Sequence, residues 1–420
     1  MLQPLIKQQD KSVKKLVIVL AATASCAPVW AQSVSGNQFN PAISLIINGG
    51  FADYSEGSEL EIAGFPVVGE AGQPEEGFGL FEAELTMSSN IDDSFYGNLN
   101  LGIHQDEGET EVDIEEAWIQ TLALPYGLTA KAGKFRSELG YLNPQHPHSY
   151  DFVDAPLLYS AMVGGAYADT GVQTTWLAPL DNYLEFGLEY TRGDAYPAGG
   201  SGNDGKGSVI AFAKTGGDIN DSQAWQLSIA HMEAEEVSAE LTGHAHGDEE
   251  AEEADNEFEG ESSLSNVSFV WKWAPKGNNK ERSATVQAEY MTRKLEGEIS
   301  HVSDTEDEQG TLDSDQAGFY IQGVYKFAPK WRAGLRYSSL TSDNLSDNDD
   351  ALEETGFADE GNKPSRTTVM LDYSNSEFSR IRFQFSKEDE TRHADEGEID
   401  NRAIYVQYIH SLGAHGAHRF

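Results

Sequence analysis

The residues of this sequence best suited to chemistry are paired histidines that stand near carboxylates. His244 and His246 open the acidic stretch GHAHGDEEAEEADNEFEGE, 243–261, and His146 and His148 stand in NPQHPHS with a tyrosine and two aspartates close behind. Imidazole nitrogens and carboxylate oxygens together suit Zn²⁺ and related divalent cations, so both pairs are candidate metal ligands. The alternative interpretation is a solvated anionic loop for the first pair and ordinary loop histidines for the second.

The sequence offers little for catalysis. Its single cysteine, Cys26, lies in a predicted targeting segment, so the mature protein has neither a thiol nucleophile nor a cysteine zinc site. Neither G-x-S-x-G nor H-E-x-x-H occurs in the chain. We therefore expect a protein that is not an enzyme and that has no cofactor apart from Zn²⁺ or another divalent cation held by its loops.

The charge balance is strongly acidic, with 28 basic against 70 acidic residues and a formal net charge of −42 at pH 7. Binding to nucleic acid depends on clustered Lys and Arg that neutralise phosphates. Nucleic acid is thus excluded as an expected partner.

The first residues read as an export signal. Four lysines precede the apolar run LVIVLAATA, and small residues lead to a predicted cleavage site after Ala31. This predicts a signal peptide over 1–31 and a mature chain over 32–420; lipidation of Cys26 is the competing interpretation. The apolar run is too short to span a bilayer as a helix, and no later segment approaches the ~20 apolar residues required. Any membrane role must therefore come from strands.

From about Ala42 onward, apolar and polar residues alternate in segments of roughly ten residues, which is the pattern of β-strands. In WRAGLRY, for example, Trp331 and Leu335 fall on one face while Arg332 and Arg336 fall on the other. The alternation predicts sixteen strands, near 42–53, 77–89, 94–104, 110–122, 128–136, 170–178, 182–192, 207–217, 222–233, 263–274, 282–294, 316–328, 330–340, 365–375, 378–388 and 400–411.

The connections between these strands alternate in length, which separates a membrane barrel from a soluble sandwich. One set is short: SNIDD, ALPYG, APLDN, GGDIND, APKGNNK, FAPK and NSEF. The other set is long except near 105–109: 54–76, 137–169, 193–206, 234–262, 295–315, 341–364 and 389–399. Outer-membrane barrels have short periplasmic turns and long outer loops. The expected fold is therefore all-β, a transmembrane antiparallel β-barrel of about 16 strands with long acidic outer loops.

The signal peptide, the sixteen strands and the terminal Phe420 make the mature chain resemble bacterial outer-membrane porins. The stretches EEAWIQT, KAGKFRSELGYLN, NPQHPHSYDFVD and YADTGVQ are more narrowly similar to proteobacterial barrels that are related to phosphate-selective porins and often labelled zinc-regulated outer-membrane receptors. The resemblance implies location in the bacterial outer membrane, a homotrimer, and a third outer loop, 137–169, that folds into the lumen as a constriction.

When the apolar face of each strand is placed outward, a set of charged residues faces the lumen. Acids come from the earlier strands and bases from the later ones, so a field is expected across the pore. The alternative interpretation is that these charges only hydrate the lumen. The predicted pore-lining residues are Glu82, Glu84, Glu185, Glu189, Glu289, Lys272, Arg332, Arg336, Arg380 and Arg382.

These features predict a channel for passive diffusion of small hydrophilic solutes. Its acidic outer loops, including the histidine-containing loop 234–262, should raise the local concentration of cations, so we expect a preference for cations and involvement in the acquisition of divalent metal such as zinc. The expected partners are outer-membrane lipid, lipopolysaccharide and the solutes themselves. The alternatives are a TonB-dependent-type metal receptor without a recognisable plug, and a surface barrel that does not transport, such as an adhesin.

Overall fold

The computed structural model describes residues 41–58, 60–68, 73–106, 109–199, 207–241, 255–303, 307–391 and 400–413. The predicted signal peptide and the pair His244 and His246 lie outside these residues.

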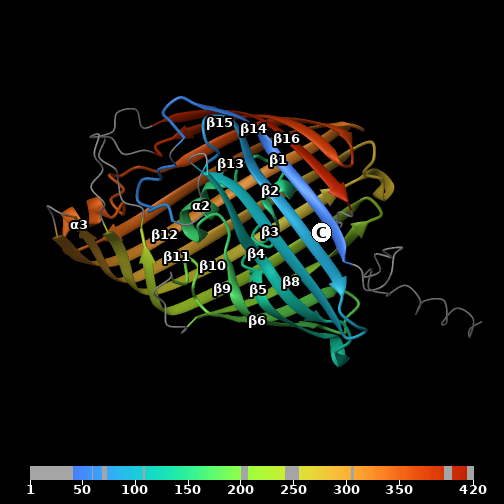
Figure 1. The fold of residues 1–420 in the computed structure, drawn as a ribbon, viewed down its shortest axis with the longest axis horizontal. Helices are drawn as coiled ribbons and strands as arrows, with labels where there is room; N and C mark the ends of the chain where they lie inside the picture. The colour runs from blue at the N-terminus through green and yellow to red at the C-terminus, as the bar shows by residue number, and fades with distance from the viewer. Residues whose placement is uncertain are drawn as a thin grey trace, which may run out of the picture. The chain divides into compact units, whose positions relative to one another are not determined.

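Sixteen antiparallel strands form one closed barrel in which each strand pairs with its neighbours in sequence and β1 pairs with β16 (Figure 1). The predicted fold class is confirmed. The strands are β1 Ala42–Tyr54, β2 Gly77–Asn90, β3 Phe95–Asp106, β4 Glu109–Thr121, β5 Leu128–Arg136, β6 Ala168–Leu177, β7 Tyr183–Thr191, β8 Ser208–Asn220, β9 Gln223–Glu240, β10 Asp255–Trp273, β11 Ser283–Val302, β12 Asp307–Ala328, β13 Trp331–Leu345, β14 Ser365–Ser376, β15 Ser379–Asp389 and β16 Asn401–Gly413.

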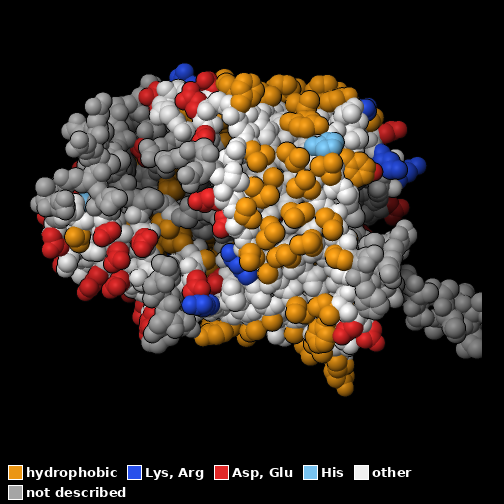
Figure 2. All heavy atoms as spheres, viewed as in Figure 1, with side chains coloured by type: hydrophobic (Ala, Val, Ile, Leu, Met, Phe, Trp, Pro, Cys, Tyr) orange, Lys and Arg blue, Asp and Glu red, His pale blue; other side chains and the backbone are white. Residues whose placement is uncertain are grey.

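The outward face of the wall is apolar because every second side chain along a strand points away from the lumen, and over the middle of the wall most of these side chains are apolar. Large hydrophobic side chains that are about half exposed lie on this face, among them Ile229, Tyr290, Leu335, Phe383 and Ile404. Figure 2 shows such side chains gathered over the wall formed by β1 to β4. A closed barrel with this exterior satisfies every backbone group within the sheet while its side chains face lipid.

Short and long connections lie at opposite ends of the barrel, here called the turn end and the loop end. The turn end carries two short helical turns, η1 Pro125–Gly127 and η3 Pro275–Gly277. The loop end carries η2 Pro147–Ser149, α2 Leu157–Val163 and α3 Asp349–Glu354. No helix among the described residues is both long and apolar enough to cross a membrane.

The strands on one side of the barrel reach farther toward the loop end than the sequence predicts. The predicted loop 234–262 is shorter, because β9 continues to Glu240 and β10 begins at Asp255. Likewise β11 and β12 occupy most of the predicted loop 295–315. The outward positions of these extensions carry acids such as Glu257, so the apolar alternation that marks a membrane strand stops before the strand does.

An apolar core fills part of the lumen at the loop end. All seven residues of α2 are buried, and they pack with inward-facing residues of the long strands and with residues of the first long connection, including Ile62 and Phe65. Gly318 of β12 makes room for the helix, since a Cβ there would lie 3.2 Å from the Cβ of Leu158. The inserted segment is thereby fixed against the inside of the wall.

Candidate functional site

The segment 137–167, which joins β5 to β6, folds into the lumen and touches the wall on several sides. We call it the inserted loop. In Figure 1 its helix α2 lies within the outline of the barrel. The backbone N–H of Val153 donates to Gln384 of β15 at 2.8 Å, whereas the backbone N–H of Tyr141 donates to Glu289 of β11 at 2.9 Å. The loop is therefore tied to strands that lie apart around the barrel.

Two wall glutamates hold the loop where it leaves β5. Glu289 accepts hydrogen bonds from the backbone N–H groups of Tyr141 and Leu142 and from the Tyr159 and Tyr320 hydroxyls, at 2.6 to 3.1 Å. Glu189 accepts from the Ser137 hydroxyl at 2.5 Å and from the Glu138 N–H at 3.0 Å. Both were predicted to line the pore. The structure places them on the inward face but buries them under the loop.

A group of arginines on β13 to β15 binds the middle of the loop. Asp151 lies 2.7 Å from Arg332, and Asp154 lies 2.7 Å from Arg336 and 2.6 Å from Arg366. Burial raises the pKa of both aspartates, but the facing arginines outweigh it and hold each pKa below its usual range. These carboxylates therefore stay ionised as partners of the arginines.

Two further predicted arginines bind backbone carbonyls of the same loop. The Arg380 guanidinium donates to the His148 carbonyl at 2.9 Å, and the Arg382 guanidinium donates to the Tyr150 carbonyl at 2.7 Å. Lys272 of β10 is half-buried on the same inward face, and Glu185 of β7 lies close to the turn end, away from these groups. Most of the predicted basic residues thus anchor the inserted loop.

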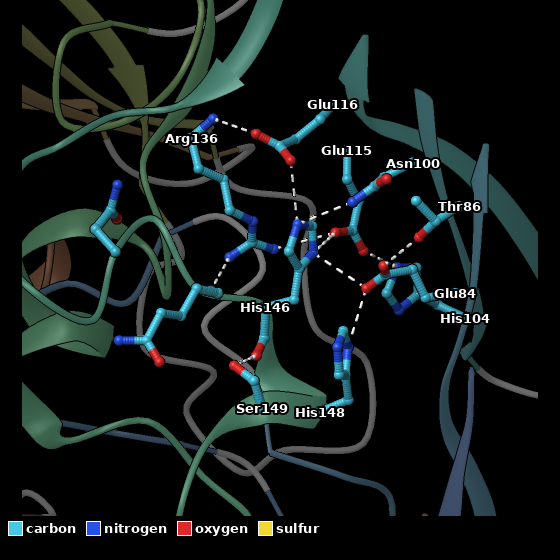
Figure 3. Close-up of polar contacts among 12 residues, drawn as sticks. Glu84, Thr86, Asn100, His104, Glu115, Glu116, Arg136, His146, His148 and Ser149 are labelled. Carbon is cyan, nitrogen blue, oxygen red and sulfur yellow. Dashed lines mark hydrogen bonds and ion pairs between the residues drawn. The ribbon is translucent and has the colours of Figure 1, made fainter. Parts of the chain in front are cut away.

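On the part of the wall beyond β16 and β1, His146 is surrounded by carboxylates from β2 and β4 (Figure 3). Its Nδ1 lies 2.8 Å from Glu115 Oε2 and 3.1 Å from Glu84 Oε2, and its Nε2 lies 3.2 Å from Glu116 Oε2. His148 Nδ1 lies 3.0 Å from the same Glu84 oxygen. Burial lowers the pKa of His146, but the hydrogen bonds to three carboxylates raise it well above its ordinary value.

A β-bulge builds this cluster. Along the pairing of β3 with β4, Asn100 faces Glu116 and Leu101 faces Ile114, so Glu115 is an extra residue in β4. A bulge breaks the alternation of side chains and can re-aim one of them. Glu115 and Glu116, although adjacent, therefore both reach His146.

The structure brings His146 and His148 together with Glu84, whereas the carboxylates that follow them in the sequence, Asp151 and Asp154, bind arginines instead. Sequence reasoning missed Glu115, Glu116, Arg136, Arg366 and Asp372, all of which join the two charged groups. The only signal for the first pair is the doubled acid in EEAWIQT, which interrupts the alternation of β4.

One curated relative shares sequence with almost the whole chain. An uncharacterized protein of Aquifex aeolicus (strain VF5) is 30% identical over 412 residues, which cover 92% of this chain and 81% of the relative. No family model matches the chain.

Solved structures with the same fold are outer-membrane proteins of low sequence identity. In-vitro folded OmpT of Vibrio cholerae has a TM-score of 0.52 at 9% identity, covering 91% of this chain and all of that one; a trimer form has the same score and identity over 89% and 99%. OprB of Pseudomonas putida has a TM-score of 0.50 at 11% identity over 89% and 94%. The chain therefore has the fold of an outer-membrane β-barrel.

Proposed function

Because the chain belongs to the same family as the uncharacterized Aquifex aeolicus protein and folds as an outer-membrane-type barrel, we propose that it is a porin-like channel of the bacterial outer membrane. It admits small hydrophilic solutes by passive diffusion, and the inserted loop sets the width of its passage. Its loop end faces the outside, where the long connections lie.

The observation that carries this proposal is the inserted loop itself. A sixteen-stranded barrel encloses a lumen, and a loop tied to facing parts of the wall narrows that lumen without closing the barrel. The anchors are charged or strongly hydrogen-bonding groups of the wall, such as Glu289 and Arg336, rather than a separate plug domain.

We also propose a preference for cations and participation in the uptake of divalent metal such as zinc. Acids line the outward face of the long strands, including Glu257, Glu259, Glu296, Glu298 and Asp313, all of which are exposed. Figure 2 shows acidic side chains gathered at the end of the molecule that bears α3. A negative entrance raises the local concentration and the entry rate of cations.

Swelling of liposomes that contain the purified protein tests the channel. Small neutral sugars should enter and cause swelling at a rate that falls as the sugar grows, without any energy source. Liposomes that stay as impermeable as protein-free ones in sugar of every size would rule out passive diffusion.

Reversal potentials in a KCl gradient test the preference for cations. The sign of the reversal potential should indicate that K⁺ permeates more readily than Cl⁻ through the intact protein. The permeability ratio of K⁺ to Cl⁻ should fall in a variant that lacks 243–254, a deletion that removes acidic residues and leaves β10 whole. A reversal potential on the Cl⁻ side in the intact protein would contradict the proposal.

A homotrimer embedded in outer-membrane lipid is the assembly we propose. Support comes from the trimer form of the Vibrio cholerae OmpT structure, which has the same fold. Divalent cations that bridge the acidic loop end to phosphates of lipopolysaccharide would stabilise its surroundings. Chemical cross-linking in native membranes tests the assembly, which requires a species of three chains; a purely monomeric product would contradict it.

A further inference from the structure

We propose that Glu84, Glu115 and His146 form a site for one divalent transition-metal cation of the Zn²⁺ class inside the lumen. The inference rests on the proposed channel only for the route by which the cation arrives. The site itself is built from the inserted loop and from two strands of the wall (Figure 3).

The three side chains already converge. One nitrogen of His146 and one oxygen from each glutamate all lie within 4.8 Å of one another. Individual separations from His146 Nδ1 are 2.8 Å to Glu115 Oε2 and 3.1 Å to Glu84 Oε2. Ligands held about 2.1 Å from a tetrahedral zinc ion stand roughly 3.4 Å apart, so a small outward movement would admit the ion.

The ring of His146 is oriented as in a metal site. Its Nε2 lies 3.2 Å from Glu116 Oε2 and 3.0 Å from the Asn100 side-chain amide. Metal-binding imidazoles commonly donate one N–H to a carboxylate, which leaves the other nitrogen for the metal. Glu116 fills that position here at Nε2, and a cation at Nδ1 would replace the proton that this nitrogen shares with Glu115 and Glu84.

Two carboxylate oxygens, one in the site and one on the neighbouring Glu82, accept no hydrogen bond of good geometry from the described residues. Glu82 is 5% exposed and its Oε2 accepts no hydrogen bond from the described residues. Glu84 is 3% exposed, and its Oε2, although close to two imidazoles, accepts no hydrogen bond of good geometry within the described chain. Buried carboxylate oxygens are costly unless they are paired or bind a cation. A divalent ion in the site would bind Glu84 Oε2 and so supply a partner for that oxygen.

The charge of the pocket favours a divalent ion as well. Four carboxylates, those of Glu82, Glu84, Glu115 and Glu116, lie around His146. The permanently charged guanidinium of Arg136 forms an ion pair with one of them, at 3.2 Å from Glu115. Acids thus outnumber the fixed positive charge at this place. A metal ion between the carboxylates would offset their mutual repulsion.

His148 is the nearest further ligand. Its Nδ1 lies 3.0 Å from Glu84 Oε2, and its ring stacks at 5.8 Å on that of His146. A mixed set of imidazole and carboxylate ligands suits Zn²⁺ better than Ca²⁺ or Mg²⁺, which take oxygen ligands alone.

A cavity reaches one of the three proposed ligands, Glu115. Glu115 and Arg136 line a space of ≈ 670 Å³ between the wall and the inserted loop, together with Asp113, Lys134 and Tyr196. The lining residues that belong to β4 and β5 lie in the halves of these strands nearer the loop end. A cation that enters from the loop end therefore reaches Glu115 without unfolding of the barrel.

Titration of the purified full-length protein with Zn²⁺ in detergent tests the inference. Excess Ca²⁺ is added to occupy sites made of oxygen ligands alone. We expect one Zn²⁺ per chain, and His146→Gln should weaken its binding by more than about 100-fold. Loss of a residue that only hydrogen-bonds a metal ligand weakens metal binding by about 10- to 100-fold, so a larger effect indicates loss of a ligand. Glu84→Gln, which keeps the shape of the side chain, should also weaken it.

The matched control is His231→Gln. His231 is an exposed histidine on the outside of β9 that lies 2.6 Å from Glu233, so it presents the same pair of groups without the pocket. Its loss should leave the affinity unchanged, as should deletion of 243–254. Equal affinity in His146→Gln and intact protein, or loss of the Zn²⁺ on deletion of 243–254 alone, would overturn the site.

Co²⁺ substitution gives a second readout that does not depend on transport. Visible absorption bands of a nitrogen- and oxygen-liganded Co²⁺ should appear in the intact protein and disappear in Glu84→Gln that still runs as a compact barrel on unheated gels. Conductance of the same variants separates the two proposals. If the intact protein forms conducting pores but binds no Zn²⁺, only the metal site is contradicted. If it binds Zn²⁺ but forms no conducting pores, only the proposed channel is contradicted.

Discussion

Inward-facing charged residues of this barrel differ in what they contact, and the contacts decide what each one does. Glu289 is buried and binds backbone and tyrosine groups of the inserted loop, whereas Glu84 faces histidines of that loop. Arg336 is paired with Asp154. A position on the lumen face of a strand is thus compatible with an anchor, a candidate ligand or a partner of a loop acid.

Glu289→Gln tests the role of an anchor. The carboxylate receives hydrogen bonds from N–H and O–H donors, and an amide would turn its own N–H₂ toward some of them. The substitution should lower the free energy of unfolding by about 1.5–3 kcal/mol, the range for hydrogen bonds to a charged group. Thermal unfolding in detergent measures it. Glu298→Gln, on the exposed outer face of the same strand, is the control and should not lower stability, because it relieves the like charge of Glu259 opposite it. An equal loss in both variants would contradict the anchor.

The sequence identified part of the His146 cluster and not the rest for a physical reason. His146 and His148 stand out because two imidazoles in one short segment are visible in the sequence. Glu115 is invisible to the same reasoning, because its inward direction depends on a bulge in the pairing of β3 with β4. Contacts between a loop and a distant strand are set by the closed barrel and by no local pattern.

At the level of elements, the inserted loop is the feature on which the passage depends. It is tied down by carboxylates at its start and by arginines in its middle. Few of its polar anchors are exposed, so water screens them weakly. We expect the loop to remain seated over a wide range of pH.

The pH at which the loop loosens follows from Asp151 and Asp154. Both have a pKa held below the ordinary value by facing arginines. Their stabilisation is fully present above the ordinary pKa of about 3.9 and is lost as the pH falls through the lowered value. Current through open pores should therefore be equally quiet from pH 7 down to about pH 5 and should become noisy only below about pH 4.

Asp154→Asn is the comparison for that experiment. It removes the charge that Arg336 and Arg366 share, so noise should appear already at pH 7. A rise in noise of the intact protein between pH 7 and pH 5, or a quiet Asp154→Asn variant at pH 7, would show that these ion pairs do not hold the loop.

The long strands show why strand existence was predictable and strand length was not. The apolar part of the outward face is here called the apolar belt. Outward positions of β10 carry Val267 and Phe269 within this belt but Glu257 and Glu259 beyond it, toward the loop end. The period of two continues, while the property that alternates changes from apolar to acidic. A prediction from the alternation of apolar and polar residues alone therefore ends the strand at the edge of the belt.

Glu296→Lys tests the acidic extension of these strands. Glu296 stands directly opposite Glu261 on β10 and Asp313 on β12, an arrangement of like charges that destabilises a sheet. A lysine there should raise stability by about 0.4–2 kcal/mol for the two pairs. Thermal unfolding at low salt measures the gain, which should shrink in about 1 M salt because the charges are exposed. A loss of stability at low salt would contradict the proposed repulsion.

For the molecule as a whole, the decisive property is an apolar exterior around a polar, partly filled interior. The sixteen strands and their outward faces followed from local alternation, and their closure from the need to pair every backbone group in lipid. The apolar core formed by α2 inside the lumen did not follow, because apolar residues in a loop do not reveal which wall they meet.

Leu335→Arg compared with Leu345→Arg tests the position of the belt. Both leucines lie on the outward face of β13, at 55% and 61% exposure, but Leu335 lies within the belt and Leu345 at the loop end of the strand. Arginine at the first position should cost about 2–4 kcal/mol in lipid vesicles, and at the second about 0–1 kcal/mol. Equal costs from denaturant unfolding would contradict a barrel that spans the membrane at this height.

The central claim is that this barrel is a pore narrowed by its own inserted loop, and single-channel recording in a planar lipid bilayer tests it most directly. The purified protein should give discrete current steps, and Asp154→Asn should give steps that are larger or fluctuate more. A bilayer that stays silent although folded barrel has inserted would contradict the claim.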